Sequence, residues 1–253
     1  MHRYYTMKSL QQYLFEAKTT LQYHKDLNPK FWKKNKLVPV VRDRLLEIGK
    51  FWAEYANIPA KAIKDILLTG GNANYNYTQY SDLDVHILVD KKKIADCDVE
   101  IMDDYLKDKK QLWGLTHDIK IYDTPVELYA QGLTEKASPN QGVYSLIKDK
   151  WIKEPVREKV DFDDPLIQSK VRSWIRKIDN FISDRVDNIT LIKQFKEKIR
   201  NMRSAGVQKG GEFSLENLVF KELRNQGYID KLINYSLKVE DETFSLSKRS
   251  KKK

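Results

Sequence analysis

Hydrophobic and polar residues alternate strictly in one stretch of the first half of the chain. Residues 82–88 read Asp-Leu-Asp-Val-His-Ile-Leu, with an apolar side chain at every odd position. A period of two is typical of a β-strand with one buried face. The stretch therefore predicts a strand that buries its odd-numbered residues and places Asp82, Asp84 and His86 together on the opposite face.

Two further segments predict strands of the same sheet. Residues 64–69 form a short, mainly apolar run, as expected of a buried strand. Residues 117–123 alternate again, and a turn expected at 123–125 leads into a segment in which apolar residues flank Glu127. Because Glu127 is flanked as Asp84 is, its segment predicts a neighbouring strand with the acid on the same face.

Helical spacing of apolar residues predominates elsewhere. It predicts amphipathic helices over 9–23, over 40–55 after Pro39, and over 98–113. Beyond Pro155 the pattern is helical throughout, with apolar stripes at Val171, Trp174, Ile175, Ile178 and Ile182 and at Leu191, Phe195 and Ile199. Gly210 and Gly211 interrupt it, and Ser214 is the expected N-cap of a helix over 215–225 that ends before Gly227.

These elements predict an α+β fold in three parts. Residues 1–155 are expected to form a small mixed β-sheet flanked by helices. Residues 156–240 are expected to form a mainly α-helical lobe, followed by a basic, flexible tail over 241–253.

Composition is that of an ordinary globular protein. The 253 residues are 41% hydrophobic and 32% charged, which is enough to bury a substantial core. No apolar run approaches the roughly 20 residues of a membrane span, and polar residues interrupt 7–21, unlike a secretory signal. The single cysteine, Cys97, excludes an intramolecular disulfide and argues against a thiolate metal site. We therefore expect a cytoplasmic protein that does not engage a membrane; the composition gives no indication of its oligomeric state.

Positive charge is concentrated in the helical part. The net charge is +10, and from Val156 onward 22 Lys and Arg residues face 15 Asp and Glu residues. Seven basic residues recur at helical spacing: Arg172, Arg176, Lys177, Lys193, Lys196, Arg200 and Arg203. They either form basic helix faces that attract a nucleic-acid backbone or are the ordinary solvated side of helices. Similarly, Tyr75, Tyr77 and Tyr80 either stack on a base or pack locally.

A glycine pair lies about ten residues before the acidic strand. Gly70 and Gly71 allow positive φ and close backbone approach, so their N–H groups can converge on a phosphate. Asp82 and Asp84 repel each other when both are ionised, so a cation is expected between them, and carboxylate oxygens suit Mg²⁺ or Mn²⁺. An Asp-x-Asp pair alone is more often a solvated strand face; together with the glycine turn it predicts a site for a metal ion and a triphosphate.

Glu127 is the preferred third carboxylate of this site. A strand fixes a side chain more firmly than a turn does, which favours Glu127 over Asp118 and Asp123. These two acids remain the alternatives at this stage.

The glycine pair, the spacer, the Asp82-x-Asp84 pair and the later strand acid Glu127 resemble the active site of the DNA polymerase β-like nucleotidyltransferase superfamily. Gly71 stands where members of that superfamily often carry serine. More narrowly, the chain is similar to predicted nucleotidyltransferases of bacteriophages and large viruses. The matching segments are 27–32, 41–46, 69–90, 126–129, 142–146, 151–155 and 213–221. A virus-encoded protein of this kind would act in the host cytoplasm.

The resemblance implies transfer of an NMP from an NTP, such as ATP, to an acceptor hydroxyl with release of pyrophosphate. It implies that Asp82, Asp84 and Glu127 hold two divalent ions, Mg²⁺ or Mn²⁺. The NTP would bind at Thr69, Gly70, Gly71, Asn72 and Ser81. His86 shares the face of the acids and either contacts the acceptor or packs against its neighbours.

The basic C-terminal helices favour RNA, for example a tRNA 3′ end, as the acceptor. One alternative is a hydroxyl on a protein or small molecule. Another is a module that binds nucleotide or RNA without catalysis, although the presence of all three acids counts against it.

Overall fold

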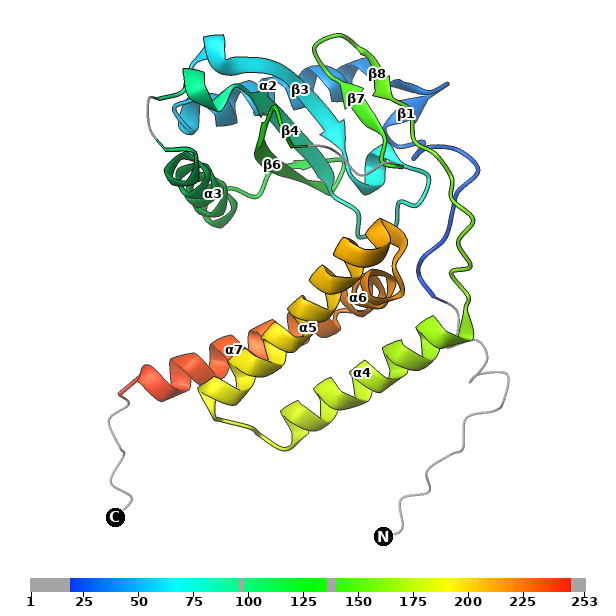
Figure 1. Cartoon of the computed structure of the whole chain (residues 1–253), viewed down its shortest axis with the longest axis vertical. Coiled ribbons are helices and arrows are strands. Elements are labelled where there is room, and N and C mark those ends of the chain that lie inside the picture. Colours follow the sequence, from blue (N-terminus) through cyan, green and yellow to red (C-terminus); the bar gives the residue numbers. More distant parts are fainter. Residues whose placement is uncertain (1–18, 96–97, 136–139, 247–253) are drawn as a thin grey trace. The chain divides into compact units, whose positions relative to one another are not determined.

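The computed structural model describes residues 19–95, 98–135 and 140–246. These residues form two compact units, shown together in Figure 1. One unit comprises Gln22–Lys159. The other unit consists of residues from Val160 onward together with Thr19–Leu21.

The unit Gln22–Lys159 contains a six-stranded mixed sheet in the order β5-β6-β4-β3-β7-β8 (Figure 1). Its strands are β3 (Ile63–Thr69), β4 (Leu83–Val89), β5 (Lys120–Ile121), β6 (Thr124–Gly132), β7 (Val143–Ser145) and β8 (Lys150–Lys153). β4 pairs with β6 in parallel, and the remaining pairs are antiparallel. A two-stranded ribbon, β1 (Trp32–Lys33) and β2 (Lys36–Leu37), precedes the sheet. The predicted α+β class with a small mixed sheet is confirmed.

The alternating pattern of β4 produces the predicted two-faced strand. Leu83, Val85, Ile87 and Val89 are completely buried, and the residues between them are partly exposed. Burial of four aliphatic side chains contributes roughly 1.5–3 kcal/mol each. This fixes the register, because a shift by one residue would turn the acids into the core.

Two helices cover the apolar face of the sheet. α2 (Pro39–Tyr55) begins with a proline in its first turn and buries the stripe that includes Val41 and Trp52. It packs closely, since a Cβ at Gly49 would lie 3.1 Å from Ile66 Cγ2 of β3. α3 (Val99–Thr116) begins after Asp98, whose side chain accepts a hydrogen bond from the Glu100 N–H at 2.8 Å. α3 is the crossover that makes the parallel pairing of β4 and β6 possible.

The helical unit contains α4 (Pro165–Ser183), α5 (Ile189–Gly210), α6 (Leu215–Asn225) and α7 (Tyr228–Phe244). The predicted interruption and the predicted helix 215–225 are confirmed, with Gly211 at φ +70° and Gly227 at φ +78°. The stripe predicted for α5 is partly wrong. Leu191 is 49% exposed and Ile192 is buried in its place, because the buried side of α5 runs through Ile192, Ile199 and Gly206 at intervals of seven.

The strand predicted over 117–123 is also shorter than expected. Only Lys120–Ile121 pairs, because Tyr122 and Asp123 adopt positive φ and form the hairpin turn into β6. Of the helix predicted over 9–23, residues 9–18 lie outside the described residues, and 19–23 are not helical. Cys97 and residues 247–253 of the predicted tail also lie outside the described residues, while 241–244 belong to α7.

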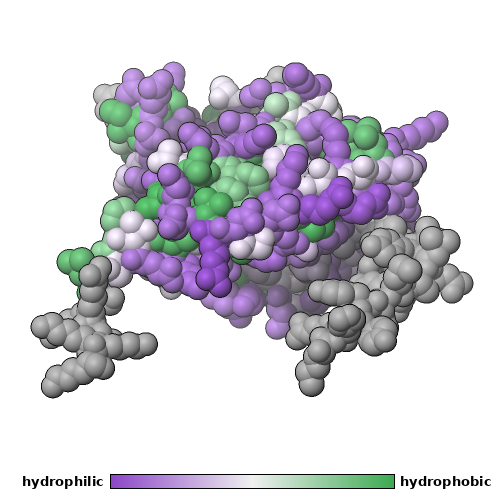
Figure 2. Space-filling model, turned by 90° about the horizontal axis from the view of Figure 1, so that it is seen from below, coloured by the Kyte–Doolittle hydropathy of each residue, from purple (hydrophilic) through white to green (hydrophobic). Residues whose placement is uncertain are grey.

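Hydrophilic side chains predominate on the face shown in Figure 2, with apolar residues in smaller groups between them. Across the described ranges, no helix combines the length and the apolar character that a bilayer span requires.

Candidate functional site

Asp82, Asp84 and Glu127 lie together at the start of two parallel strands. The register of β4 and β6 sets Asp84 opposite Glu127. Asp82 lies two residues before Asp84 and therefore points to the same side. One carboxylate oxygen from each residue lies within 4.8 Å of the other two, so this group could hold a metal ion.

The two alternative third acids lie elsewhere. Asp118 is 77% exposed and pairs with Lys120 at 2.7 Å. Asp123 occupies the turn at φ +65° and is exposed. Among the described residues, neither acid belongs to a group that could share an ion with Asp82 and Asp84.

The electrostatics of Asp84 favour a bound cation. Burial, followed by the nearby charges of Asp82 and Glu127, raises the pKa of Asp84 to about 8, and Lys110 partly opposes this shift. At neutral pH the metal-free carboxyl is therefore mostly protonated. A divalent ion would supply the charge that lets all three acids ionise, and hard carboxylate oxygens are the ligands that Mg²⁺ and Mn²⁺ prefer.

Lys110 of α3 places a positive charge beside the third acid. Its Nζ lies 3.2 Å from Glu127 Oε2 and 5.7 Å from the centre of the Tyr129 ring. Both partners of the ion pair are partly exposed, at 40% and 51%. No motif in the sequence identifies Lys110, because its position depends on how α3 packs beside β6.

The glycine loop touches the acids directly. Gly70 has φ +74°, and a Cβ built there would lie 1.6 Å from Asp84 Oδ2. A Cβ at Gly71 would lie 2.7 Å from Ser81 Oγ. Only glycine at position 70 allows the backbone to approach the Asp84 carboxylate this closely.

The side chains of Thr69, Asn72 and Ser81 bind protein groups in this loop. The Thr69 hydroxyl donates to the Gly142 carbonyl at 3.1 Å. Asn72 is 1% exposed, and its Nδ2 donates to the carbonyls of Ser81 and Asp82 at 2.9 and 2.8 Å. Ser81 Oγ accepts from the Thr78 N–H at 2.9 Å. Asn72 therefore ties the glycine loop to the start of β4.

Asn28 and the first residue of β1, Trp32, hold Asn72 from the other side. Asn28 Nδ2 donates to Asn72 Oδ1 at 2.8 Å, and the Trp32 indole N–H donates to the Asn72 carbonyl at 2.7 Å. Trp32 in turn stacks on Trp151 of β8, with ring centres 4.8 Å apart. Segment 27–32 carries part of the sequence resemblance, but its spacing alone did not reveal this supporting role.

His86 lies on the same face, one step along β4 from Asp84. Its Nδ1 lies 2.9 Å from Gln131 Oε1, and its ring meets Tyr129 edge to face at 5.1 Å. Burial lowers the pKa of His86, so the neutral ring predominates at neutral pH.

Two of the three loop tyrosines pack locally. Arg157 lies over the Tyr75 ring at 3.8 Å, and Tyr77 stacks on His24 at 3.8 Å. Tyr80 is 47% exposed, two residues before Asp82. In this loop, Tyr80 is the tyrosine whose ring is most accessible to a base.

The predicted basic residues differ in their surroundings. Lys196 donates to Ser236, Lys177 lies over Trp174, and Arg203 lies over Phe220. Within the part of the chain that the structure describes, none of the seven forms an ion pair. Four of them also form no side-chain hydrogen bond or cation–π contact there: Arg172, Arg176, Lys193 and Arg200.

Comparison with known proteins provides no family assignment. No protein-family model matches the sequence, and no curated protein matches it. Among solved structures, the STING-associated CdnE c-di-GMP synthase from Capnocytophaga granulosa aligns over 82% of this chain and 83% of its own. The identity is 12% and the TM-score 0.19. Because the TM-score is so low, this likeness says nothing about the activity of the chain.

Proposed function

We propose that the chain is a metal-dependent nucleotidyltransferase of the polymerase β-like type. It would transfer an NMP from an NTP to an acceptor hydroxyl and release pyrophosphate. The observation that carries this proposal is the parallel register of β4 and β6, which sets Asp84 opposite Glu127 beside Gly70. One carboxylate oxygen from each of Asp82, Asp84 and Glu127 then lies within 4.8 Å of the other two.

The three acids would hold two ions of Mg²⁺ or Mn²⁺. When bound, such ions lower the pKa of an attacking hydroxyl and neutralise a leaving pyrophosphate. The residues fit this role, because Asp84 is mostly protonated at neutral pH unless a cation compensates its burial and the neighbouring acids. Lys110 pairs with Glu127 from the side of α3 and would compete with the ions for this carboxylate.

The glycine loop would bind the triphosphate. The backbone N–H groups of Gly70 and Gly71 are the proposed phosphate donors, and the partly exposed Ser81 hydroxyl is a further candidate. Thr69 and Asn72 would act indirectly, because both are buried and hydrogen-bonded to protein groups. Their proposed role is to hold the loop at a fixed distance from Asp82.

RNA is the proposed acceptor. Its support comes from the helical unit, where Arg172, Arg176, Lys193 and Arg200 form no ion pair within the described residues. Such side chains can bind a phosphate backbone without first breaking an internal contact. Binding of RNA through them would weaken steeply as the salt concentration rises.

Labelling with nucleotides tests donor and acceptor together. The full chain is incubated with each α-labelled NTP and Mg²⁺ or Mn²⁺, in the presence of RNA, of a protein extract, or of neither, and pyrophosphate release is measured. Label on RNA supports the full proposal. Label on protein or on a small molecule supports the proposed nucleotidyl transfer but contradicts RNA as the acceptor.

Matched variants assign the signal to the site. Glu127→Gln and Asp82→Asn should abolish labelling, whereas Asp118→Asn should leave it unchanged, because Asp118 is exposed and paired with Lys120. Nucleotide binding without labelling under any condition would identify a non-catalytic binding module. Equal labelling by Asp82→Asn and the wild type would contradict the assignment of Asp82, Asp84 and Glu127 as the active site.

A further inference from the structure

A cavity of about 440 Å³ continues the acidic face of the sheet within the unit Gln22–Lys159. His86, Tyr129 and Gln131 form its polar side, and Leu67, Val143 and Ile152 form an apolar side. Its size falls within the roughly 300–1,000 Å³ that is usual for small-ligand sites, as does the combination of apolar walls with a few polar groups.

The cavity adjoins the three acids. His86 follows Asp84 by two residues on β4, and Tyr129 follows Glu127 by two residues on β6. Two residues of a strand span about 7 Å. A nucleoside-sized ligand in the cavity could therefore present a hydroxyl group to the acids.

A chain of hydrogen bonds determines which nitrogen of His86 carries the proton. Gln131 Nε2 donates to the Glu135 carbonyl at 2.8 Å, which leaves Gln131 Oε1 to face His86 Nδ1 at 2.9 Å. Because an amide oxygen only accepts, the neutral imidazole must donate from Nδ1. Its Nε2 then carries a lone pair, and no described protein group hydrogen-bonds to it.

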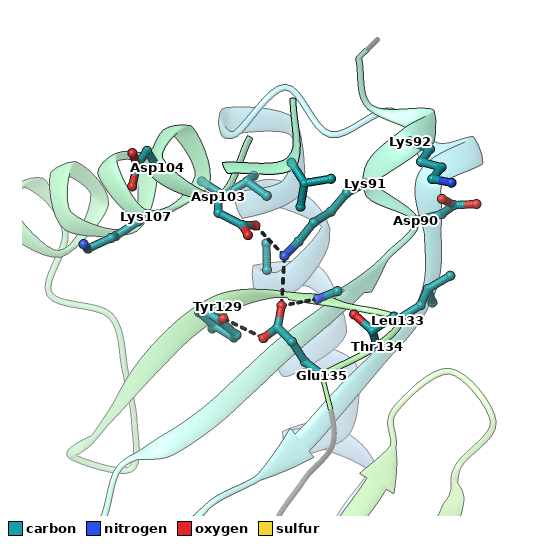
Figure 3. Close-up of a pocket in the computed structure, with 14 residues that line it drawn as sticks. Asp90, Lys91, Lys92, Asp103, Asp104, Lys107, Tyr129, Leu133, Thr134 and Glu135 are labelled. Atoms are coloured by element: carbon teal, nitrogen blue, oxygen red, sulfur yellow. Dashed lines mark hydrogen bonds and ion pairs between the residues drawn. The ribbon is translucent and has the colours of Figure 1, made fainter. Parts of the chain in front are cut away.

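Glu135 holds the Tyr129 side of the cavity in place, and both of its carboxylate oxygens are engaged by protein groups. Its carboxylate accepts from the Tyr129 hydroxyl at 2.7 Å and from the Gly132 N–H at 2.8 Å, and it pairs with Lys91 at 2.9 Å (Figure 3). Lys91 also reaches Asp103 of α3 at 2.5 Å. Lys91 therefore compensates the charge of Glu135. For this reason Glu135 would not attract a positively charged acceptor to the cavity.

These features together define the ligand. We propose that the cavity binds the nucleoside that carries the acceptor hydroxyl. The base would lie against Leu67, Val143 and Ile152, and a sugar hydroxyl would donate to His86 Nε2. The inference rests on the proposed function and specifies its acceptor as a nucleoside, either at the 3′ end of an RNA or in a free nucleotide.

Binding to the full chain in a chelator tests the cavity separately from catalysis. Adenosine, guanosine, cytidine and uridine are titrated individually by calorimetry, and a six-nucleotide RNA with a 3′-hydroxyl is compared with the same RNA ending in a 3′-phosphate. At least one nucleoside should bind. Binding of the 3′-hydroxyl RNA, weakened by the 3′-phosphate, identifies an RNA end, whereas binding of nucleosides alone identifies a free nucleotide.

Two variants address the two sides of the cavity. Ile152→Glu should weaken nucleoside binding by about tenfold or more, because it places a charge on the apolar wall. Ile147→Glu is its matched control, since Ile147 is similarly exposed, at 46% against 53%, but does not line the cavity. His86→Asn retains an amide donor for Gln131 and removes the Nε2 acceptor, and should also weaken binding by about tenfold.

The outcomes separate this inference from the proposed function. If NTP labelling occurs but neither a nucleoside nor RNA binds in the presence of a chelator, the cavity is not the acceptor site. The proposed nucleotidyltransferase activity is then still supported. Equal nucleoside binding by Ile152→Glu and Ile147→Glu also overturns the inference. Specific nucleoside binding without any labelling supports the cavity as a nucleoside-binding site and contradicts the proposed nucleotidyltransferase activity.

Discussion

Replacing Asp84 with asparagine should stabilise the metal-free protein. The substitution keeps the shape of the side chain and removes its ability to ionise. In the folded protein, burial and the charges of Asp82 and Glu127 raise the pKa of Asp84 from an ordinary 3.8 to about 8. A carboxyl whose pKa is raised by folding binds a proton more tightly in the folded state, so stability falls as the pH rises from about 4 to about 8.

The size of the effect follows from this shift. One pKa unit corresponds to about 1.36 kcal/mol. At pH 7 the Asp84 carboxyl therefore costs the folded state up to about 4 kcal/mol, and at pH 4.5 about 1 kcal/mol. Because Asp82 and Glu127 share the cost, we expect Asp84→Asn to gain about 2–4 kcal/mol at pH 7 and much less at pH 4.5.

Urea unfolding in a chelator, followed by tryptophan fluorescence, measures this gain. Trp32, Trp52, Trp113 and Trp151 report on the unit that contains the site. Asp118→Asn is the control for charge, because this exposed acid should change stability by no more than about 0.5 kcal/mol. Added Mg²⁺ should stabilise the wild type and not Asp84→Asn.

A specific result would refute the reasoning. If Asp84→Asn lowers the free energy of unfolding at pH 7, or changes it equally at pH 7 and pH 4.5, then the carboxyl carries no ionisation penalty in the fold. The acids would then have no electrostatic requirement for a cation, and the proposed metal site would lose its main physical support.

Four other perturbations address the same site. Gly70→Ala should abolish Mn²⁺ binding, measured by electron paramagnetic resonance, because its Cβ would collide with Asp84 Oδ2. Lys110→Met should strengthen Mn²⁺ binding several-fold in the same assay, because it removes the charge that competes for Glu127. Asn72→Asp should lower stability by about 1–3 kcal/mol in urea unfolding and weaken Mn²⁺ binding, because the amide donors to the Ser81 and Asp82 carbonyls are lost. Mn²⁺ affinity of the wild type should rise with pH up to about 8, since the ion must displace the proton of Asp84.

Three of these perturbations have their own control or contrary outcome. Gly211→Ala, at a similar φ of +70° but with no neighbour near its Cβ, separates backbone strain from the collision with Asp84. Lys109→Met removes an adjacent charge whose Nζ lies over the Tyr55 ring. Unchanged Mn²⁺ affinity in Lys110→Met would place that lysine outside the electrostatics of the site. A pH-independent Mn²⁺ affinity would contradict the raised pKa of Asp84.

The acidic face of β4 was predictable because it depends on local alternation alone. Leu83, Val85 and Ile87 must be buried, and this choice determines where Asp82 and Asp84 point. Placing Glu127 on the same face was predictable for the same reason. The sequence did not determine that Glu127 lies directly opposite Asp84, because that register depends on how the α3 crossover packs.

Residues that act through long-range packing were not predictable. Asn72 follows the glycine pair, and this position predicts a phosphate contact. The structure buries its side chain between the carbonyls of Ser81 and Asp82, just before β4, and the side chain of Asn28. Lys110 has no recognisable sequence context, since it reaches Glu127 only through the position of α3. In both cases the partner is more than eight residues away, beyond the range of any local pattern.

The electrostatics of the site also explain why many residues of the unit Gln22–Lys159 support the short glycine loop. Three acids held close together without a metal ion oppose folding, and Gly70 contributes no side chain to compensate. The opposing stability must come from groups that do no chemistry: the buried side of β4, and the hydrogen bonds by which Asn28, Trp32 and Asn72 join the loop to the strand. If these bonds hold the site against its own repulsion, then Asn28→Ala should destabilise the wild type more than it destabilises Asp84→Asn, in which part of that repulsion is absent.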